Sequence, residues 1–467
     1  MSFLPYVPFA HALVAKQDLP IPAWLFAWAA SIVLIVSFFA LSAAWRKPRF
    51  EQEHWRPGAA WLSSVLLNPV TQALCGAFGV FLLGVAAYSG IEGTEAPDRN
   101  FAITFLFVTV WLGFPFFSAF LGDIFRPFNP WRAIGRAAGA GFRVLAGQPA
   151  AHLRYPERLG RWPAAIGLLA FVWLEVVYGS SGGVAVGLDP HAAGLAALLY
   201  TAYTLAMMAL FGVEEWCRRG ETFSVYFGMF SQLAPFGMQD GRIGRRRPLA
   251  AATHWATIPG SAAVVLASIA TTSFDGAQDG AFKSAIESVI TTAENIGFDP
   301  LGAVRVTDTL FLLATFAAVA AVYTLGVRGM RSVPGSPAFK ALFQGFAHSL
   351  IPIALAYLIA HYFSLFVYQE QAQFTYLLSD PLGTATTDLF GTAEAGIDFR
   401  LLSPNLIWYV QVAALVIGHV LGLTLAHDRA LVYWRDYRRA SRSQYWMLAV
   451  MVAFTCFGLY LLSVSNL

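Results

Sequence analysis

The sequence predicts an all-α integral membrane protein with about ten transmembrane helices. Of its 467 residues, 57% are hydrophobic and 15% aromatic, whereas only 12% are charged, about half the charged share of soluble globular proteins. Apolar runs long enough to cross a bilayer recur along the chain, and basic and acidic loops alternate between them. We therefore expect a single polytopic domain over residues 1–467, surrounded by lipid and without a nucleic-acid partner.

Each predicted helix is an apolar run of roughly 20 residues, the length that spans the hydrocarbon core. The first 22 residues lack a charged segment followed by an apolar core and a small-residue cleavage site, so we expect no cleaved signal peptide. Three cysteines, Cys75, Cys217 and Cys456, are far apart and indicate neither a disulfide framework nor a thiolate metal site. The predicted spans are 22–45, 62–89, 101–122, 163–182, 192–213, 255–273, 306–328, 340–368, 403–426 and 445–463.

The charged loops alternate in sign along the chain. Loops rich in Lys and Arg stay on the cytoplasmic side of a membrane, whereas acidic residues have little influence. The alternation therefore predicts that the basic loops are cytoplasmic and that both termini and the acidic loops lie outside. The basic loops are 124–162, 216–254 and 427–444, and the acidic loops are 90–100, 274–304 and 369–402.

Two kinds of segment are too polar or too short to span. From Phe282 to Ile296, apolar residues recur at helical spacing between polar ones, which predicts an amphipathic helix on the outer membrane surface or a lid over the bundle. On the inner side, residues 123–131 and 223–237 are aromatic and broken by prolines. We expect these two segments to lie at the interface or to re-enter the bundle.

His348 and His419 lie inside predicted spans, where ionisable residues are costly and usually face the interior of a bundle. They lie about eight and about seven residues from the inner ends of consecutive spans, so their depths match. We expect these spans to pack together with both rings inside. The pair predicts two axial ligands of haem b, or ligands of copper. The alternative is that each ring only hydrogen-bonds a neighbouring helix.

His361 lies near the outer end of its span, at a depth that Glu175 and Asp308 reach on other spans. One histidine and two carboxylates can hold a divalent metal ion whose bound water serves as the nucleophile. We therefore predict catalytic and metal-binding roles for His361, Asp308 and Glu175. The alternative is that these side chains are structural, with Asp308 paired to Arg305 three residues earlier.

Common motifs of soluble enzymes are absent. The sequence contains no H-x-H, H-E-x-x-H or C-x-x-C pattern and no phosphate-binding glycine loop. Any chemistry must therefore be built from residues scattered over several spans.

Several groups of residues nevertheless form a recognisable pattern. They are Gln17-Asp18-Leu19-Pro20-Ile21-Pro22, Asn129-Pro130-Trp131, the stretch from His348 to Tyr357, the stretch from Trp408 to Val412, Gly418-His419-Val420 and His427-Asp428-Arg429. Together they resemble a bacterial family of multi-spanning membrane proteins that carry the name fenitrothion hydrolase. The resemblance covers most of the chain.

The resemblance implies a hydrolase of organophosphorus triesters in the bacterial inner (cytoplasmic) membrane that works with a second membrane or periplasmic subunit. We therefore expect that an apolar substrate reaches the site through the lipid and is attacked by a metal-activated water. Two alternatives stay open. One is a membrane redox protein that binds haem or copper at His348 and His419, and the other is a transporter or structural subunit without chemistry.

The charge alternation predicts which segments a reagent outside the cell can reach. Cysteines introduced at Arg245 or Arg247 should react with a membrane-impermeant maleimide only after lysis, whereas cysteines in the loop 369–402 should react in intact cells. Labelling of residues 242–247 from outside would show that this topology is inverted.

Overall fold

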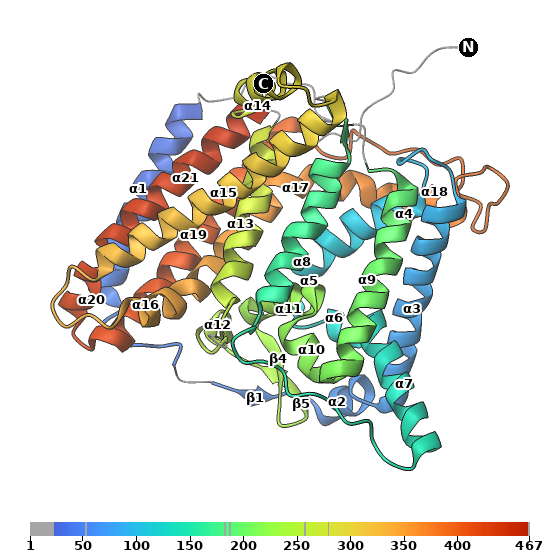
Figure 1. Cartoon of the computed structure of the whole chain (residues 1–467). Helices are drawn as coiled ribbons and strands as arrows, with labels where there is room; N and C mark the ends of the chain where they lie inside the picture. The colour runs from blue at the N-terminus through green and yellow to red at the C-terminus, as the bar shows by residue number, and fades with distance from the viewer. Residues whose placement is uncertain are drawn as a thin grey trace.

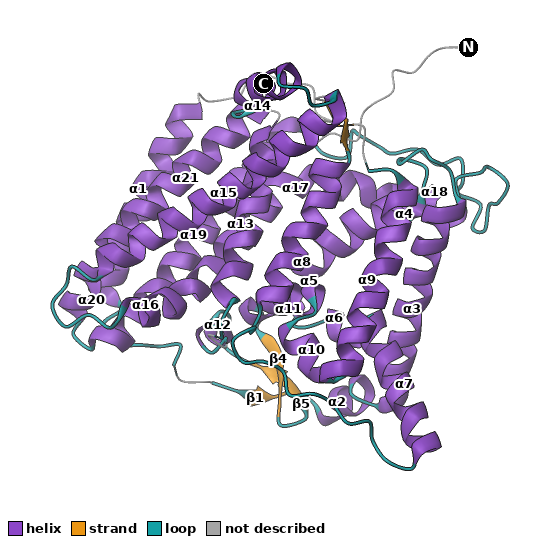
Figure 2. Cartoon of the chain, in the orientation of Figure 1, coloured by secondary structure: helices purple, strands orange, loops and turns teal. Residues whose placement is uncertain are grey.

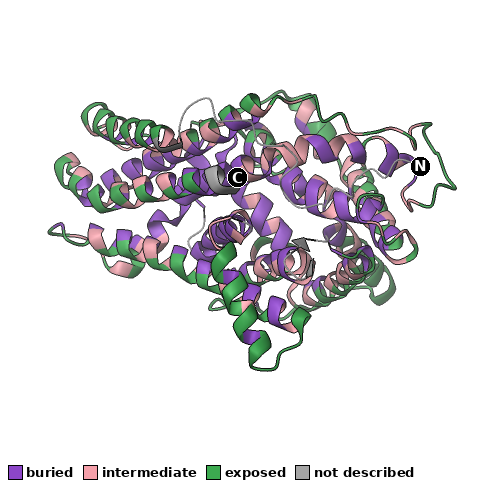
Figure 3. Cartoon of the chain, turned by 90° about the horizontal axis from the view of Figure 1, so that it is seen from above, coloured by how far each residue is buried: buried purple, intermediate pink, exposed green. Residues whose placement is uncertain are grey.

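The computed structural model describes residues 23–51, 54–181, 184–185, 188–255, 258–278 and 280–465. Helices form almost all of its regular structure and stand side by side in a bundle (Figure 1, Figure 2). Seen from above, buried residues gather inside the bundle and exposed residues lie around it (Figure 3). The predicted all-α fold is confirmed. The motif at residues 17–22 lies outside the described residues.

The first half of the chain builds short helices at the bundle ends and longer ones between them. Two segments in this half are π-helices, η1 and η2, and one is a 3-10 helix, η3. The helices are α1 (Ala23–Ala44), α2 (Ala60–Leu66), α3 (Pro69–Glu92), α4 (Phe101–Thr104), η1 (Phe105–Gly113), α5 (Phe114–Leu121), α6 (Phe125–Phe128), α7 (Pro130–Ala146), α8 (Trp162–Val172), η2 (Trp173–Tyr178), α9 (Pro190–Phe211), α10 (Val213–Arg219), α11 (Thr222–Phe230) and η3 (Ser231–Leu233).

The second half contains the longest helices. They are α12 (Ala250–Thr253), α13 (Ser261–Gln278), α14 (Lys283–Asn295), α15 (Pro300–Met330), α16 (Phe339–Phe346), the 3-10 helix η4 (Ala347–Leu350), α17 (Ile351–Gln373), α18 (Tyr376–Ser379), α19 (Pro404–Trp434), α20 (Tyr437–Ser443) and α21 (Tyr445–Ser465). Short antiparallel strands pair in the orders β1-β5-β4 and β2-β3. They are β1 (Arg56–Pro57), β2 (Ser180–Ser181), β3 (Val184–Ala185), β4 (Phe236–Gln239) and β5 (Arg242–Arg245).

Seven helical segments within the described residues are long and apolar enough to cross a membrane, and the bent pair of α20 and α21 makes up to eight. Two of the predicted spans differ from the rest. The span predicted at 163–182 is the shorter apolar helix Trp162–Tyr178. The span predicted at 255–273 is α13, whose polar residues lower its hydropathy. The α13 helix is enclosed by other helices, whereas α8 exposes Trp162 and Ile166.

The two ends of the bundle differ in charge. The α14 helix and the segment 380–403 lie at one end, which we name the acidic end, and α1 begins there and α21 ends there (Figure 1). The strands β4 and β5 and the arginine-rich helices α7 and α20 lie at the opposite, basic end. The acidic loops and the basic loops therefore lie at opposite ends of the bundle, as the charge alternation predicts. Which end faces the cytoplasm stays a prediction.

The α13 helix is the buried centre of the fold. All of its residues except Gly276 and Gln278 are buried, although it carries Ser268, Thr271 and Asp275 among other polar residues. It packs against α8, α15, α17 and α21. Two threonine hydroxyls donate to carbonyls of the preceding turn, Thr271 Oγ1 to Ala267 at 2.9 Å and Thr272 Oγ1 to Ser268 at 3.1 Å. The surrounding helices therefore keep a polar helix away from lipid.

Two acidic residues that the loop boundaries place outside lie inside helices. The predicted loop 274–304 starts too early, because α13 continues to Gln278 and buries Asp275. The predicted loop 369–402 also starts too early, because α17 continues to Gln373 and carries Glu370. Hydropathy ends a span at its first charged residue, whereas a helix ends only where its backbone geometry changes.

The segments predicted not to span are found as helices and turns. The amphipathic segment is α14, which buries Ile286 and Ala293 against the acidic end of the bundle. The stretch 223–237 forms α11, η3 and the start of β4, and Phe227 and Phe230 of α11 are fully buried. This stretch is therefore packed inside the bundle.

The α17 and α19 helices pack closely because two glycines of α19 face α17. A Cβ on Gly418 would lie 2.2 Å from the Cβ of Ala356, and a Cβ on Gly422 would lie 2.7 Å from the Ser349 carbonyl oxygen. Small residues four positions apart let two helix backbones approach each other. His419 sits between these glycines at the contact.

Replacing Gly422 with leucine should push α19 away from α17, because the space that a Cβ needs is occupied by backbone. Overpacking of this kind costs about 1–3 kcal/mol. We expect a lower midpoint of thermal unfolding in detergent for Gly422→Leu. Gly141→Leu is the control, since a Cβ there meets nothing within 4 Å. Equal midpoints for the two variants would contradict the close packing.

Candidate functional site

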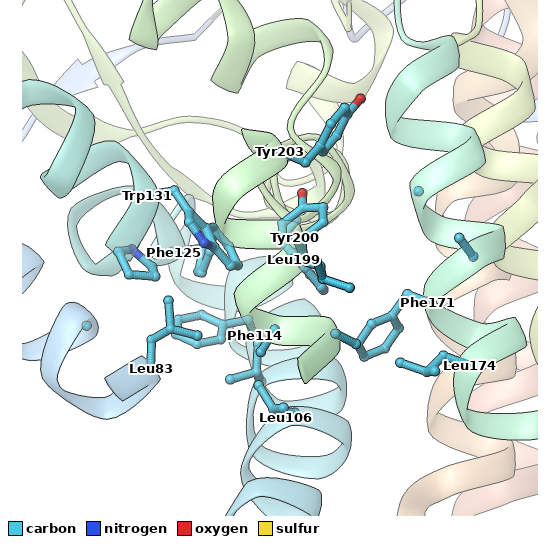
Figure 4. Close-up of a pocket in the computed structure, with 18 of the residues that line it drawn as sticks. Leu83, Leu106, Phe114, Phe125, Trp131, Phe171, Leu174, Leu199, Tyr200 and Tyr203 are labelled. Carbon is cyan, nitrogen blue, oxygen red and sulfur yellow. The ribbon is translucent and has the colours of Figure 1, made fainter. Parts of the chain in front are cut away.

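A large apolar cavity lies between α3, α8, α9 and η1, with a volume of about 1100 Å³. Trp131 and Tyr200 lie on one side of this space, and Phe171 and Leu174 lie on the other (Figure 4). Small-molecule sites usually measure roughly 300–1,000 Å³ and are lined mostly by apolar and aromatic side chains. The cavity therefore has the size and surface of a site for an apolar ligand.

The cavity reaches the outer surface of the bundle between α8 and α9. Ile166 of α8 and Leu199 of α9 both line the cavity, yet they are 62% and 63% exposed. Both side chains are purely apolar, and their helices stand apart in Figure 1. In a membrane this surface is covered by lipid. An apolar molecule dissolved in the bilayer can thus approach the cavity from its side.

The wall at the basic end of the cavity is built by the Asn129-Pro130-Trp131 motif. The Trp131 ring stacks on Phe223 with ring centroids 5.6 Å apart, and its Nε1 donates to Thr201 Oγ1 at 2.8 Å. Pro130 starts α7 at its first position, where a missing N–H is tolerated. The motif therefore fixes an aromatic wall, a role that its sequence alone does not reveal.

A fully buried carboxylate holds this wall in place. Glu221 accepts hydrogen bonds from the Tyr200 hydroxyl at 2.6 Å, from Asn129 Nδ2 at 3.1 Å and from the backbone N–H groups of Phe223 and Ser224. It is the N-cap of α11, where the helix dipole favours a negative charge. Because its oxygens are fully engaged, Glu221 is a structural residue that orients Tyr200.

The polar corner of the cavity lies toward the acidic end. Thr109 of η1 lines the cavity, and the Glu370 carboxyl of α17 lies beside its hydroxyl. Neither Thr109 Oγ1 nor Glu370 Oε1 completes a hydrogen bond within the described part of the chain, although both atoms are buried. Buried polar atoms without partners often mark a site for water or a ligand. From the sequence, Glu370 was assigned to the acidic loop 369–402 and was therefore not considered as a site residue.

His361 belongs to a separate polar cluster on α13 and α17. Its Nε2 lies 3.0 Å from Asp275 Oδ2, and the neighbouring Tyr362 hydroxyl donates to the same oxygen at 2.5 Å. Gln278 Nε2 donates to Asp275 Oδ1 at 3.1 Å. Asp275 is thus the carboxylate that the structure brings to His361. Asp275 lies only two residues beyond the predicted span 255–273. Extending that helix by one turn would have placed Asp275 inside the bundle.

His361 also borders a small cavity of about 20 Å³, together with Thr272, Ser273 and Gly276 of α13. A cavity of this size holds about one water molecule when polar groups line it. The Ser273 hydroxyl is buried and makes no hydrogen bond with the described residues. The geometry therefore suits one water beside the His361 ring. His361 is not among the residues that line the large cavity.

The other two predicted members of this site lie on neighbouring elements. Glu175 lies in η2, close enough to Tyr362 to interact with its hydroxyl electrostatically. Asp308 is buried on α15, which packs against α13. No group of three or more His, Cys, Asp or Glu side chains among the described residues is arranged to hold a metal ion. The divalent metal stays a prediction.

Aromatic rings separate the large cavity from the His361 cluster. Phe171 lines the cavity and lies 4.9 Å from Trp111, which in turn stacks on Tyr226 at 4.7 Å. Tyr226 contacts Ser268 of α13 through its hydroxyl at 3.4 Å. A ligand in the cavity therefore meets Phe171 and the π-helices before it meets the His361 cluster.

His348 and His419 lie on packed helices, as predicted, and both rings are buried. Their surroundings differ. His348 lies near Arg429 and His254, whereas His419 is among the residues that line a small cavity. That cavity measures about 20 Å³, which accommodates a single ion or water but not a porphyrin. The space beside His419 therefore does not fit a haem.

Comparison with known protein families, characterised proteins and solved structures finds no match to this chain. The resemblance to the fenitrothion hydrolase family therefore stays a prediction.

Removing the Tyr362 hydroxyl should leave Asp275 with one hydrogen bond fewer in a buried site. The loss of a partner for a buried acceptor costs about 1–3 kcal/mol. We expect Tyr362→Phe to unfold at lower temperature in detergent than the unaltered chain. Tyr409→Phe is the control, because Tyr409 is half exposed. If both variants unfold together, Tyr362 does not support the Asp275 carboxylate.

Proposed function

We propose that the protein is a membrane-embedded hydrolase that takes a neutral, apolar triester from the lipid into the large cavity and cleaves it with water. The cavity is the observation that carries this proposal. Its volume suits a ligand with one or two aromatic rings, and aryl organophosphorus triesters are uncharged molecules of this kind. The resemblance described above implies the same substrate class.

The lining supports a neutral substrate. No Lys, Arg, Asp, Glu or His side chain lines the cavity, so a charged ligand would find no partner there. Tyr203 and Thr109 place hydroxyl-bearing side chains at its edges, whereas the Tyr200 hydroxyl is donated to Glu221. A hydroxyl donates to a phosphoryl or thiophosphoryl group without needing a charge. Apolar walls with a few polar groups are what orient small ligands in proteins.

Glu370 is the group that we assign to the attacking water. Water held between Thr109 and Glu370 gives a proton to the carboxylate as its oxygen bonds to phosphorus. The bond from phosphorus to the aryl oxygen breaks, and the leaving aryloxide takes the proton back from the Glu370 carboxylic acid. The products are a dialkyl acid and a phenol, so atoms and charge balance. General acid–base catalysis of this kind contributes roughly 10²–10⁴-fold in rate.

The predicted centre of His361, Asp308 and Glu175 offers a second place for the same proton transfer. It has a histidine hydrogen-bonded to a carboxylate and room for one water. It differs from the Glu370 corner in that a substrate would have to pass the ring of Trp111. No step of this proposal depends on a metal ion or on a second subunit, both of which stay predictions.

The cavity can be tested by filling it. We expect the purified chain in proteoliposomes to release nitrophenolate from a dialkyl nitrophenyl phosphate triester, measured by absorbance. Ala197→Trp places a large ring in the cavity and should lower kcat/KM at least tenfold. Leu198→Trp is the matched control, because the adjacent Leu198 does not line the cavity and is half exposed. A chain without measurable hydrolysis would rule out the function.

The same assay separates the two candidate centres. Glu370→Gln should lower kcat by about 100-fold or more with KM little changed, since it keeps the shape and removes the proton acceptor. Glu394→Gln, in an exposed loop, should have no effect. If His361→Ala loses hydrolysis while Glu370→Gln keeps it, the chemistry belongs to the cluster predicted from the sequence.

A further inference from the structure

The α7 helix belongs to the bundle only in its first half. Its buried residues all lie in its first turn, where Trp131 forms part of the cavity wall. A Cβ on Gly135 would still meet side chains of α9 and α10, whereas a Cβ on Gly139 or Gly141 would meet nothing within 4 Å. Residues 140–146 are all exposed. This second half projects from the basic end of the bundle (Figure 1).

One face of α7 is apolar from its start to its end. Its residues recur every three or four positions and therefore share a side of the helix. They are Trp131, Ile134, Ala138, Phe142 and Leu145. Trp131 is buried in the bundle, whereas Phe142 and Leu145 are 48% and 90% exposed. The same apolar face is thus covered by protein at one end of the helix and exposed at the other.

The arginines of α7 gather on another side of the helix. At about 100° per residue, Arg132, Arg136 and Arg143 lie within about 40° of one another and about 140° from the middle of the apolar face. Helices with Trp, Phe and Leu on one side and arginines on the other are typical of the membrane interface, where they lie along the surface. The pattern of α7 therefore favours lipid as the cover of its exposed apolar residues.

The positive charge of these arginines is only partly neutralised by the protein. The Glu214 carboxylate faces three guanidinium groups at 2.7, 3.0 and 3.7 Å, those of Arg136, Arg132 and Arg126. Asp123 also lies near Arg126, and Arg143 makes no ion pair with the described residues. Two carboxylates therefore serve four arginines. An excess of positive charge next to a membrane attracts anionic headgroups.

We propose that residues 138–146 of α7 lie in the headgroup region of the leaflet at the basic end and bind anionic phospholipid. Phe142 and Leu145 enter the boundary with the acyl chains, and Arg136 and Arg143 contact phosphate groups. Guanidinium suits this role because its planar fork matches phosphate oxygens in pairs. The bound lipid would hold Trp131, and with it one wall of the large cavity, at a fixed depth. The proposal does not depend on hydrolysis.

The test is amide hydrogen exchange of the full-length chain in nanodiscs, followed by mass spectrometry. One set of discs contains phosphatidylcholine alone, and the other contains equal parts of phosphatidylcholine and phosphatidylglycerol. Exchange at residues 138–146 should be about tenfold slower in the anionic discs, because contacts of two arginines with an anionic surface shift the equilibrium by at least that factor. High salt should remove the difference, since it screens exposed charges.

Two double variants separate the contributions of charge and apolar contact. Arg136→Gln/Arg143→Gln should exchange at the same rate in both kinds of disc. Phe142→Gln/Leu145→Gln should do so as well, and glutamine keeps a high helix propensity. All four positions are exposed, so the fold should persist, which the midpoint of thermal unfolding verifies.

Arg154→Gln is the matched control, because its side chain is 88% exposed in the same basic loop but outside α7. It should keep the lipid dependence of the unaltered chain. Equal exchange of the unaltered chain in the two kinds of disc would overturn the proposal, and so would a lipid dependence kept by the arginine variant. Slow exchange in both kinds of disc would show that a protein surface or neutral lipid covers the face instead.

Discussion

The architecture depends on one electrostatic constraint, which is that α13 cannot face lipid. A carboxylate and several hydroxyls on one helix would each cost free energy in hydrocarbon, so the helix must be enclosed by others. Hydrogen bonds from Tyr362 and Gln278 partly offset the free energy of burying the Asp275 carboxylate. The helices around α13 are then free to present apolar residues to the membrane. The need to keep the polar side chains of α13 away from lipid thus explains both the polar centre of the bundle and its apolar outer surface.

Burial is uneven across the bundle. The helices around α13 pack densely, and the glycines of α19 bring it close to α17. On another side of the bundle, α3, α8, α9 and η1 enclose the large cavity. Two π-helices border this side, and such segments are often found at functional sites. The closely packed helices around α13 therefore support the helices that enclose the large cavity.

Much of the fold follows from the sequence because hydropathy and loop charge are properties of single segments. The spans, the amphipathic α14 and the alternation of loops were predictable for this reason. The site was not, because it depends on which helices are neighbours. His361 was predicted as a site residue, but its hydrogen-bonded neighbour Asp275 was assigned to a loop. The large cavity is built from apolar residues such as Phe171 and Leu199, which carry no signal that separates them from core or lipid-facing positions.

The exposed position of Ile166 and Leu199 has a consequence for how the cavity is filled. A ligand that arrives between these residues comes from the bilayer, so its relevant concentration is its mole fraction in lipid. Its partition coefficient then contributes to apparent affinity as much as contacts inside the cavity do. Adding empty vesicles would dilute such a ligand without changing its total amount in the sample. Occupancy would thus be a property of the membrane as well as of the protein.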